Sequence, residues 1–345
     1  MHALLVTSDD RVITEFQKIA AVTQTPLVIE SEPNASDISN AYRVFVATDC
    51  AQANLNHAEI VLVVIGTTGP ETWRFAAKLS ANHIAVIPDS RDWLVEHLSA
   101  PVTKRGLCVA IIPGAGGAGA SLLSAGLAFH ARQLFTDVVL VDFDESSAGL
   151  DIVLGIETQP GMRWQDFHPL SGSISGSDIL RGLPARDGVA LLTHNDSKSA
   201  AEKFVPEAII QQLRGVSGLV IIDFPRFTNQ IAAVKILQQC DVAFVVTPST
   251  VRGSASTKIA ITKISKHVTT TELVIRNLPG TNLDSLRIAQ SLDVPLAGVV
   301  NTDPRIVEQI EQGFGVSGIH LGGFTRSLNA LAQRLAQTND SQQAA

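Results

Sequence analysis

A glycine-rich turn between an apolar run and a helical pattern constrains the fold of this 345-residue chain more than any other feature. Residues 107–112 (LCVAII) predict a buried strand, residues 113–121 (PGAGGAGAS) the turn, and the following residues a helix to about Leu134. Glycines in such a turn let successive backbone N–H groups converge on one point, and the helix N-terminus adds positive potential. The unit therefore predicts an anion site within an α/β domain. Its glycines are Gly114, Gly116, Gly117 and Gly119.

Two domains are expected. Residues 1–99 alternate helical patterns with five short apolar runs, which predicts a small doubly wound α/β domain with a parallel sheet. Residues 100–106 (APVTKRG) carry Pro, Gly and two adjacent charges and predict a linker. Residues 107–337 then form a second α/β domain with a mostly parallel sheet, and the polar residues 338–345 (TNDSQQAA) form a flexible tail. The five runs are 3–6, 27–29, 44–46, 60–65 and 84–87.

The composition disfavours a protein that coats nucleic acid. With 45% hydrophobic and 17% charged residues the chain is globular, and its net charge of −7 lacks the surplus of Lys and Arg that phosphate binding needs. We expect no sequence-specific nucleic-acid partner. The most basic stretch predicts a solvated helix face, with a local DNA contact as the alternative; it contains Arg252, Lys258, Lys263 and Lys266.

The chain has no run of about 18 apolar residues and no cleavable N-terminal signal, which predicts a cytoplasmic protein. Widely spaced cysteines exclude zinc and iron–sulfur sites built from closely spaced ligands and predict buried thiols; they are Cys50, Cys108 and Cys240. One C-terminal stretch has apolar residues at helical spacing. It predicts a helix packed on its own domain, with peripheral contact at the inner face of the membrane as the alternative, through Phe324, Leu328, Leu331 and Leu335.

The order of the first domain resembles that of a response-regulator receiver. A receiver needs acidic groups after its first strand, an aspartate after the third, a hydroxyl after the fourth and a lysine after the fifth. Asp9, Asp10, Asp49 and Thr67 stand in the first three places, whereas residues 87–89 (IPD) contain no lysine. A phosphate on Asp49 would lack its charge partner. We therefore predict a pseudo-receiver used for protein contact, with phosphorylation of Asp49 as the alternative.

Three aspartates end buried strands of the second domain. The segment TDVVLVDFD ends in Asp142 and Asp144, and the segment GLVIID ends in Asp223. Four apolar residues followed by an aspartate have the Walker B form, whose carboxylate holds Mg²⁺ through water. Ser121 stands where a P-loop places its Mg²⁺-binding hydroxyl. We expect the glycine turn to face Asp142 and Asp223 across one pocket sized for a polyphosphate.

Together these segments resemble the MinD/ParA superfamily of deviant P-loop ATPases. That family reads KGGxGK[ST] in its loop, so both of its lysines are replaced here, by Ala115 and Ala120. In the family the first aspartate of the DxD segment lies near the metal and the second helps to position attacking water. The resemblance implies Ser121, Asp142 and Asp223 as metal ligands and Asp144 as the catalytic residue.

The same resemblance implies ATP and Mg²⁺ as cofactors. An asparagine after a later strand contacts adenine in the family, usually in the order Asn-Arg, whereas this chain has Arg276-Asn277; the reversed pair assigns the adenine contact to Asn277. The phosphates would contact the loop at Gly114, Gly116, Gly117, Ala118, Gly119, Ala120 and Ser121.

Several stretches are similar to the septum site-determining (Ssd), CpaE-like group of this superfamily. The resemblance covers nearly the whole chain. It implies a regulator of septum placement in cell division, with protein partners in the division machinery or in a pilus-type secretion machinery and a homodimer as one assembly. The stretches are residues 93–95 (WLV), 116–121 (GGAGAS), 149–151 (GLD), 161–166 (GMRWQD) and 173–183 (SISGSDILRGL).

The loss of both lysines predicts weak nucleotide binding with slow or absent hydrolysis. Phosphoryl transfer relies on stabilising charge, whereas the backbone turn and the metal site can still bind phosphate. Three function classes follow. The first is a nucleotide-responsive spatial regulator, and the second is a non-catalytic pseudo-ATPase scaffold that localises a Tad-type pilus or secretion machinery. The third, a redox enzyme on the same fold, needs paired cluster cysteines that the chain lacks.

Overall fold

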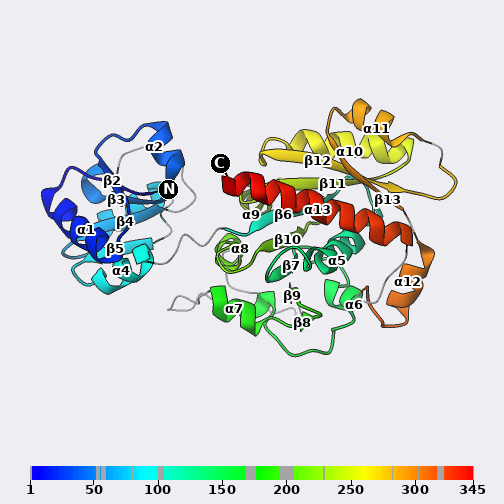
Figure 1. Cartoon of the computed structure of the whole chain (residues 1–345), viewed down its shortest axis with the longest axis horizontal. Coiled ribbons are helices and arrows are strands. Elements are labelled where there is room, and N and C mark those ends of the chain that lie inside the picture. The colour runs from blue at the N-terminus through cyan, green and yellow to red at the C-terminus, as the bar shows by residue number, and fades with distance from the viewer. Residues whose placement is uncertain are drawn as a thin grey trace. The chain divides into compact units, whose positions relative to one another are not determined.

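The computed structural model divides the chain into two compact units, residues 1–103 and 104–345 (Figure 1). It describes residues 2–51, 55, 60–79, 81, 83–99, 105–167, 176–194, 206–227, 230–281, 283–301, 303–316 and 322–344. Residues 100–104 of the predicted linker and 173–175 of the Ssd-like stretches lie outside the described residues. Gly106, the last residue of the predicted linker, already belongs to the second unit, because its N–H donates to Arg214 O at 2.8 Å.

The first unit is a five-stranded parallel sheet with strand order β2-β1-β3-β4-β5, a common doubly wound order. Each predicted apolar run is a strand, because a sheet covered on both faces selects apolar side chains at successive positions. The strands are β1 His2–Val6, β2 Leu27–Glu30, β3 Ala41–Ala47, β4 Ile60–Ile65 and β5 His83–Ile87. The helices are α1 Asp10–Thr23, α2 Ala35–Asn40, α3 Pro70–Leu79 and α4 Arg91–Ser99, and the 3-10 turn η1 is Thr48–Cys50.

The second unit contains an eight-stranded sheet with order β13-β12-β11-β6-β10-β7-β9-β8. All its neighbours pair in parallel except β8 and β9, which are antiparallel. The strands are β6 Leu107–Pro113, β7 Val138–Asp142, β8 Ala185–Arg186, β9 Val189–Leu192, β10 Leu219–Asp223, β11 Val242–Pro248, β12 Thr270–Asn277 and β13 Leu296–Asn301.

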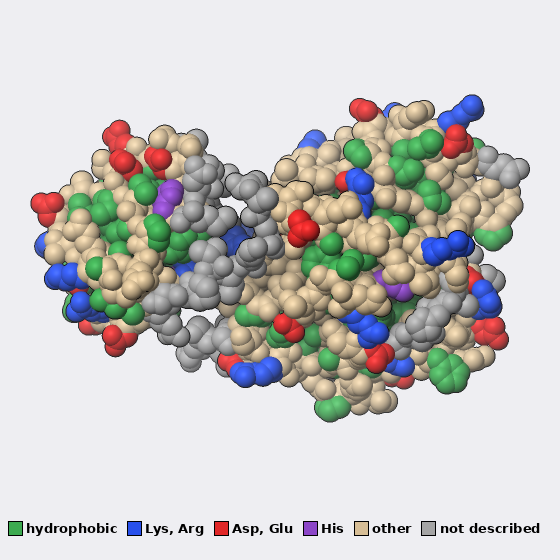
Figure 2. Space-filling view, viewed as in Figure 1, with side chains coloured by type: hydrophobic (Ala, Val, Ile, Leu, Met, Phe, Trp, Pro, Cys, Tyr) green, Lys and Arg blue, Asp and Glu red, His purple; other side chains and the backbone are tan. Residues whose placement is uncertain are grey.

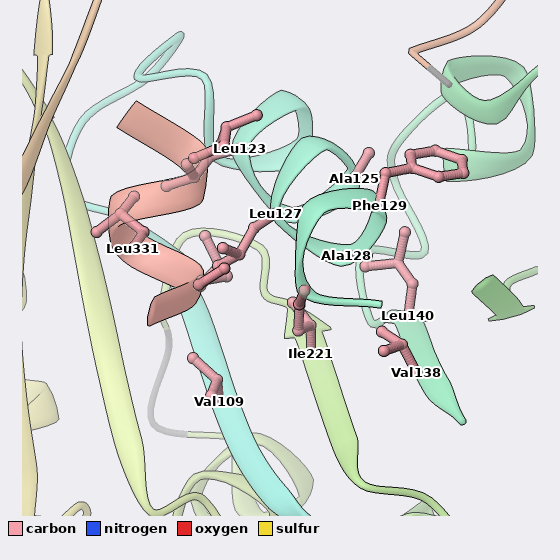
Figure 3. Close-up of a cluster of buried hydrophobic side chains, with 14 of the residues drawn as sticks. Val109, Leu123, Ala125, Leu127, Ala128, Phe129, Val138, Leu140, Ile221 and Leu331 are labelled. Carbon is pink, nitrogen blue, oxygen red and sulfur yellow. The ribbon is translucent and has the colours of Figure 1, made fainter. Parts of the chain in front are cut away.

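Two layers of helices cover this sheet and bury its alternate side chains. On one face α5 (Ala120–Ala131), α6 (Leu150–Leu154), α12 (Pro304–Glu311) and α13 (Gly322–Ala344) pack on residues such as Val109 and Ile221. Figure 3 shows α5 lying over these strands with Leu331 of α13 beside it. The other face buries Ala110 and Ile222. It is covered by α7 Gly176–Gly182, α8 Pro206–Arg214, α9 Ile231–Leu237, α10 Val251–Ile264 and α11 Ser285–Leu292, with the 3-10 turn η2 at Trp164–Asp166.

Helix α13 corrects the prediction of a flexible tail at 338–345, because it continues through Ala344. A helix that is already nucleated and packed extends at little cost into polar residues, whereas the composition of the tail alone favours disorder. Its four apolar residues at helical spacing are 1–5% exposed, which confirms the predicted packing on its own domain; they are Phe324, Leu328, Leu331 and Leu335. Arg334 of the same helix forms two 2.6 Å hydrogen bonds to Glu272 of β12.

The surface of the second unit mixes charges of both signs. On the face drawn in Figure 2, acidic and basic side chains are interspersed, and the described side chains form no continuous basic patch there. The four cations of the predicted solvated helix face, in and just after α10, are all exposed: Arg252, Lys258, Lys263 and Lys266. None of the described helices combines the length and the apolar character that crossing a bilayer requires.

Candidate functional site

The glycine turn joins β6 to α5, where the conformation of the backbone depends on glycine. Gly117 and Gly119 have φ angles of +68° and +87°, a region that side chains with a Cβ rarely adopt. Gly114 donates its N–H to Val246 O at 2.8 Å, and a Cβ at that position would lie 2.3 Å from Thr257 Oγ1. The turn is thus held between β11 and α10 and opens at the N-terminus of α5, which is the arrangement that binds anions.

Sheet pairing brings two of the predicted acids together. Asp223 at the end of β10 pairs in register with Asp142 at the end of β7, and on its other side with Ile111 of β6, two residues before the turn begins. The strand order β6-β10-β7 therefore places Asp223 between the turn and Asp142. Both aspartates are almost completely buried, with 1% and 0% of their surfaces exposed.

Two hydroxyls of α5 reach the Asp223 carboxylate. Ser124 Oγ donates to Asp223 Oδ1 at 2.8 Å, and the Ser121 hydroxyl lies near enough to lower the pKa of this carboxylate. The pKa of Asp223 is nevertheless raised to about 7, chiefly because burial disfavours the charged carboxylate; the two serine hydroxyls lower it, and the negative charges of Asp142 and Asp144 raise it. The structure thus joins the predicted metal ligands Ser121 and Asp223 at the start of α5.

Asp142 is held by groups from the segments that follow β7 and β9. Its Oδ2 accepts from Thr193 Oγ1 at 2.9 Å and from Leu150 N at 3.0 Å, and its Oδ1 accepts from Asp144 N at 3.1 Å. Burial raises the pKa of Asp142, which these hydrogen bonds oppose. Asp144, the predicted catalytic residue, follows β7, is only partly buried, and accepts from Ser146 N at 3.0 Å.

The donor set fits a hard divalent cation. Asp142 and Asp223 are buried, yet within the described chain neither forms an ion pair with Lys or Arg, although a buried charge normally has a partner or binds a metal. Carboxylate and hydroxyl oxygens are the ligands that Mg²⁺ accepts, and Mg²⁺ usually completes its shell with water and phosphate. Among the described residues, no group of three or more His, Cys, Asp or Glu side chains is placed to hold a metal ion.

The predicted adenine contact, Asn277, ends β12 and is exposed. Its Nδ2 donates to Asn301 Oδ1 at 3.3 Å. Beside it lies a small cavity of about 30 Å³. Arg276 and Asn301 line this cavity together with Gly119. Asn277 does not line it, so the neighbouring Arg276 is the residue that joins the end of β12 to the turn.

Helix α12 lies between this cavity and the segment after Asp142. The Asp303 side chain accepts a hydrogen bond from Arg305 N and so caps the N-terminus of α12. Asp303 also lines the cavity, together with Ile306 and Val307. Beyond the other end of α12, Val316 N donates to Val153 O of α6 at 3.0 Å. Gly315 packs so closely on α6 that a Cβ there would lie 2.5 Å from Leu154 O.

Several of these contacts were not predicted from the sequence. In the sequence, Ser124 has the appearance of an ordinary helix residue. Thr193 follows the apolar run of β9, so the same strand-end pattern that identified Asp142 could have identified it. Arg276 was noted only for its order relative to Asn277, and its contact with the turn depends on the strand order.

In the first unit two of the receiver-like residues, Asp49 and Asp9, are held by hydrogen bonds from neighbouring residues. Asp49 accepts from Thr7 Oγ1 at 2.9 Å, from Ser8 N at 2.7 Å and from Ser8 Oγ at 2.8 Å. Burial raises the pKa of Asp49, but these hydrogen bonds outweigh it and leave the pKa below its usual value. Asp9 caps α1 and pairs with Arg11 at 2.7 Å, which lowers the pKa of Asp9 to about 2.

Comparison with known sequences relates both units to other proteins. The family model for the "Rv3660c-like, CheY-like N-terminal domain" matches residues 6–107. The uncharacterized protein Rv3660c of Mycobacterium tuberculosis is 30% identical over 274 residues, covering 77% of this chain and 77% of that protein. The uncharacterized ATP-binding protein MJ0547 of Methanocaldococcus jannaschii is 27% identical over 212 residues, covering 59% of this chain and 78% of that protein.

Solved structures match the second unit in fold. The cell division ATPase MinD of Pyrococcus furiosus superposes with a TM-score of 0.57 at 21% identity, over 68% of this chain and 99% of that one. The septum site-determining protein MinD of Pyrococcus horikoshii, complexed with Mg-ADP, gives 0.55 at 20% identity, over 67% and 96%. A ParA family ATPase of Chlorobium tepidum gives 0.58 at 16%, over 67% and 98%. The predicted fold class, a CheY-like domain followed by a MinD/ParA-like domain, is confirmed.

Proposed function

The chain belongs to the Rv3660c-like family, and on that premise we propose that it is a nucleotide-responsive spatial regulator of the MinD and CpaE kind, acting in septum site placement during cell division. Its lysine-less loop binds Mg-nucleotide weakly and hydrolyses it slowly or not at all. Nucleotide occupancy shifts the chain between partner-bound and free forms, or between monomer and dimer. The partners are protein components of the division machinery.

The observation that carries this proposal is the meeting of Ser121, Asp223 and Asp142 beside the glycine turn. Two buried carboxylates in register, without a Lys or Arg partner among the described residues, call for a cation. The N–H groups of the turn and the N-terminus of α5 offer positive potential to phosphates on the same side. Together they give a site for a magnesium-bound polyphosphate.

Slow hydrolysis follows from the residues at the two lysine positions. Ala115 and Ala120 are 8% and 5% exposed, so each places a buried methyl group where the resemblance implies a cation. Losing charge stabilisation beside a transferring phosphoryl group costs orders of magnitude in rate. Asp144, which follows the buried part of β7, would position water for the residual reaction.

Calorimetry with the full-length chain tests this function. We expect saturable binding of Mg-ADP and Mg-ATP, a weaker affinity in Asp142→Ala, and an unchanged affinity in Asp92→Ala, which removes an exposed carboxylate from α4 of the other unit. Thermal shifts measured on the same samples report whether each variant is folded. A folded wild-type chain that gives neither heat nor a thermal shift at millimolar nucleotide would exclude nucleotide-responsive regulation.

A scaffold for a Tad-type pilus or secretion machinery is the second candidate. It is favoured by the hydrogen bonds that the acids already receive from the chain itself, from Ser124 to Asp223 and from Thr193 to Asp142. A scaffold needs no ligand to stabilise these groups. It predicts no thermal shift with nucleotide, and it predicts that Asp142→Asn leaves partner binding unchanged.

A further inference from the structure

Two arginines from distant parts of the chain lie against the glycine turn. Arg276, at the end of β12, donates from Nη1 to Gly117 O at 3.0 Å. The same nitrogen lies 3.0 Å from the position that a Cβ on Gly119 would occupy, and Arg276 Cδ lies 3.2 Å from it. Arg226, three residues after Asp223, places its Nη1 4.0 Å from the corresponding position on Gly116. The Arg276 guanidinium therefore contacts the backbone of the turn itself, and the Arg226 guanidinium lies near Gly116.

Two of the three glycines near these arginines are the direct neighbours of the positions at which lysine is missing. Gly116 follows Ala115, and Gly119 precedes Ala120. We propose that Arg276 and Arg226 supply the bound polyphosphate with the positive charge that the alanines cannot, so that the turn binds nucleoside di- and triphosphates through arginine. This inference rests on the proposed function and names the residues by which its site recognises phosphate.

Arginine suits this role from outside the turn. Its guanidinium stays protonated at every physiological pH and presents several N–H donors in one plane, which allows bidentate bonding to phosphate oxygens. Glycine at position 119 leaves the space that the Arg276 head occupies, since a Cβ there would touch both Cδ and Nη1. The hydrogen bond to Gly117 O holds the Arg276 guanidinium against the turn before any ligand binds. Less side-chain rotamer entropy is therefore lost when a ligand binds.

The strand order explains why β12 can supply this cation. The neighbours β6, β11 and β12 bring Pro113, Val246 and Val274 into one row. Arg276 lies two residues beyond Val274, on the same face of the sheet and next to the last residue of β12. Its side chain therefore reaches back toward the turn that follows Pro113. It also lines the small cavity with Asn301, between the turn and the end of β12 that carries Asn277.

Binding of four probes to the full-length chain tests the inference: Mg-ADP, pyrophosphate, AMP and adenosine. We expect Arg276→Ala and Arg226→Ala each to lower the affinity for Mg-ADP and for pyrophosphate about tenfold, which is the effect of losing one charge-assisted hydrogen bond. The affinity for adenosine should change little, because it carries no phosphate. Arg276→Lys should recover part of the loss, and in Arg276→Ala the salt dependence of Mg-ADP binding should become shallower.

Arg181→Ala is the matched control, because it removes an arginine whose side chain is 76% exposed and pairs with Asp178 on α7. Circular dichroism and thermal unfolding establish that each variant folds; if Arg276→Ala does not fold, Arg276→Gln takes its place. A wild-type chain that binds none of the phosphate probes would overturn both the inference and the proposed function. Two results would overturn the inference alone. In the first, the wild type binds Mg-ADP and both arginine variants bind it with the same affinity. In the second, the variants lose affinity for adenosine as strongly as for Mg-ADP.

Discussion

The hydroxyl of Ser124 donates to the carboxylate of Asp223 across 2.8 Å, in a place where water hardly reaches either group. This contact ties the first turn of α5 to the end of β10. It also explains why Asp223 can remain buried beside Asp142, since a buried carboxylate without donors would be far more costly. The effect of this buried carboxylate on the stability of the chain can be measured.

Replacing Asp223 by Asn should change the pH dependence of stability. Burial raises the pKa of Asp223 from 3.8 to about 7, so between these values the folded chain holds a proton that the unfolded chain releases. The contribution of this group to the free energy of unfolding therefore falls as the pH rises from about 4 to about 7, and it is constant above that range. Asp223→Asn should remove this slope and be the more stable protein at pH 8. Urea unfolding in EDTA from pH 5 to 8 measures the free energy of unfolding of both proteins. If this free energy changes with pH in parallel for the wild type and Asp223→Asn, the prediction is wrong.

Two glycines of the turn should respond differently to alanine. A Cβ at Gly114 would lie 2.3–2.9 Å from three atoms of the buried Thr257, so Gly114→Ala should destabilise the second unit by about 1–3 kcal/mol. Gly117 faces open space but has a φ of +68°, so Gly117→Ala should lower the free energy of unfolding by about 1 kcal/mol through backbone strain alone. Gly322→Ala, in open space with an ordinary φ, is the control. Equal unfolding midpoints for the three variants would refute this ranking.

Arg214→Ala should destabilise the second unit by about 3 kcal/mol. Arg214 Nη2 pairs with Asp241 at 2.7 Å, its Nε donates to Gly106 O at 3.0 Å, and Nη1 donates to Gln239 O. Removal leaves the partly buried Asp241 carboxylate with only the hydrogen bond from Cys108 N, and it takes the Arg214 donor away from two carbonyls. Arg181→Ala, which breaks an exposed ion pair, should cost less than about 1 kcal/mol. Denaturant unfolding of both variants compares them, and similar losses would count against the structural role of Arg214.

Asp49 should resist phosphorylation by acetyl phosphate. Thr7 and Ser8 already donate three hydrogen bonds to its carboxylate, Asp9 is paired with Arg11, and residues 87–89 offer no lysine. Intact-mass measurement should show no phosphate adduct after incubation with Mg²⁺. Asp49→Ala should lower the stability of the first unit by about 1 kcal/mol, because Thr7 loses its acceptor. A phosphate adduct that is absent from Asp49→Ala would restore the receiver alternative.

Much of the fold was predictable because parallel strands covered on both faces require continuous apolar runs, as at 107–112 and 60–65. The placement of Asp142 and Asp223 followed from their position after such runs. What local pattern could not reveal was the order of the strands. The contact between Arg276 and Gly117 joins residues 159 positions apart and exists only because β11 separates β12 from β6. The end of α13 was misread because local polarity says nothing about the packed turns that precede it.

Helix α12 connects the cavity beside Arg276 to the segment that contacts Asp142. Its first turn forms one wall of the cavity beside Arg276, and the residues after its last turn are bonded to the backbone of α6. Asp303 and Val316 stand at the two sides of this eight-residue helix, and Val153 lies in the same helix α6 as Leu150. The Asp142 carboxylate accepts a hydrogen bond from Leu150 N. The cavity beside Arg276 and the Asp142 carboxylate are thus connected through one short helix and two backbone donors.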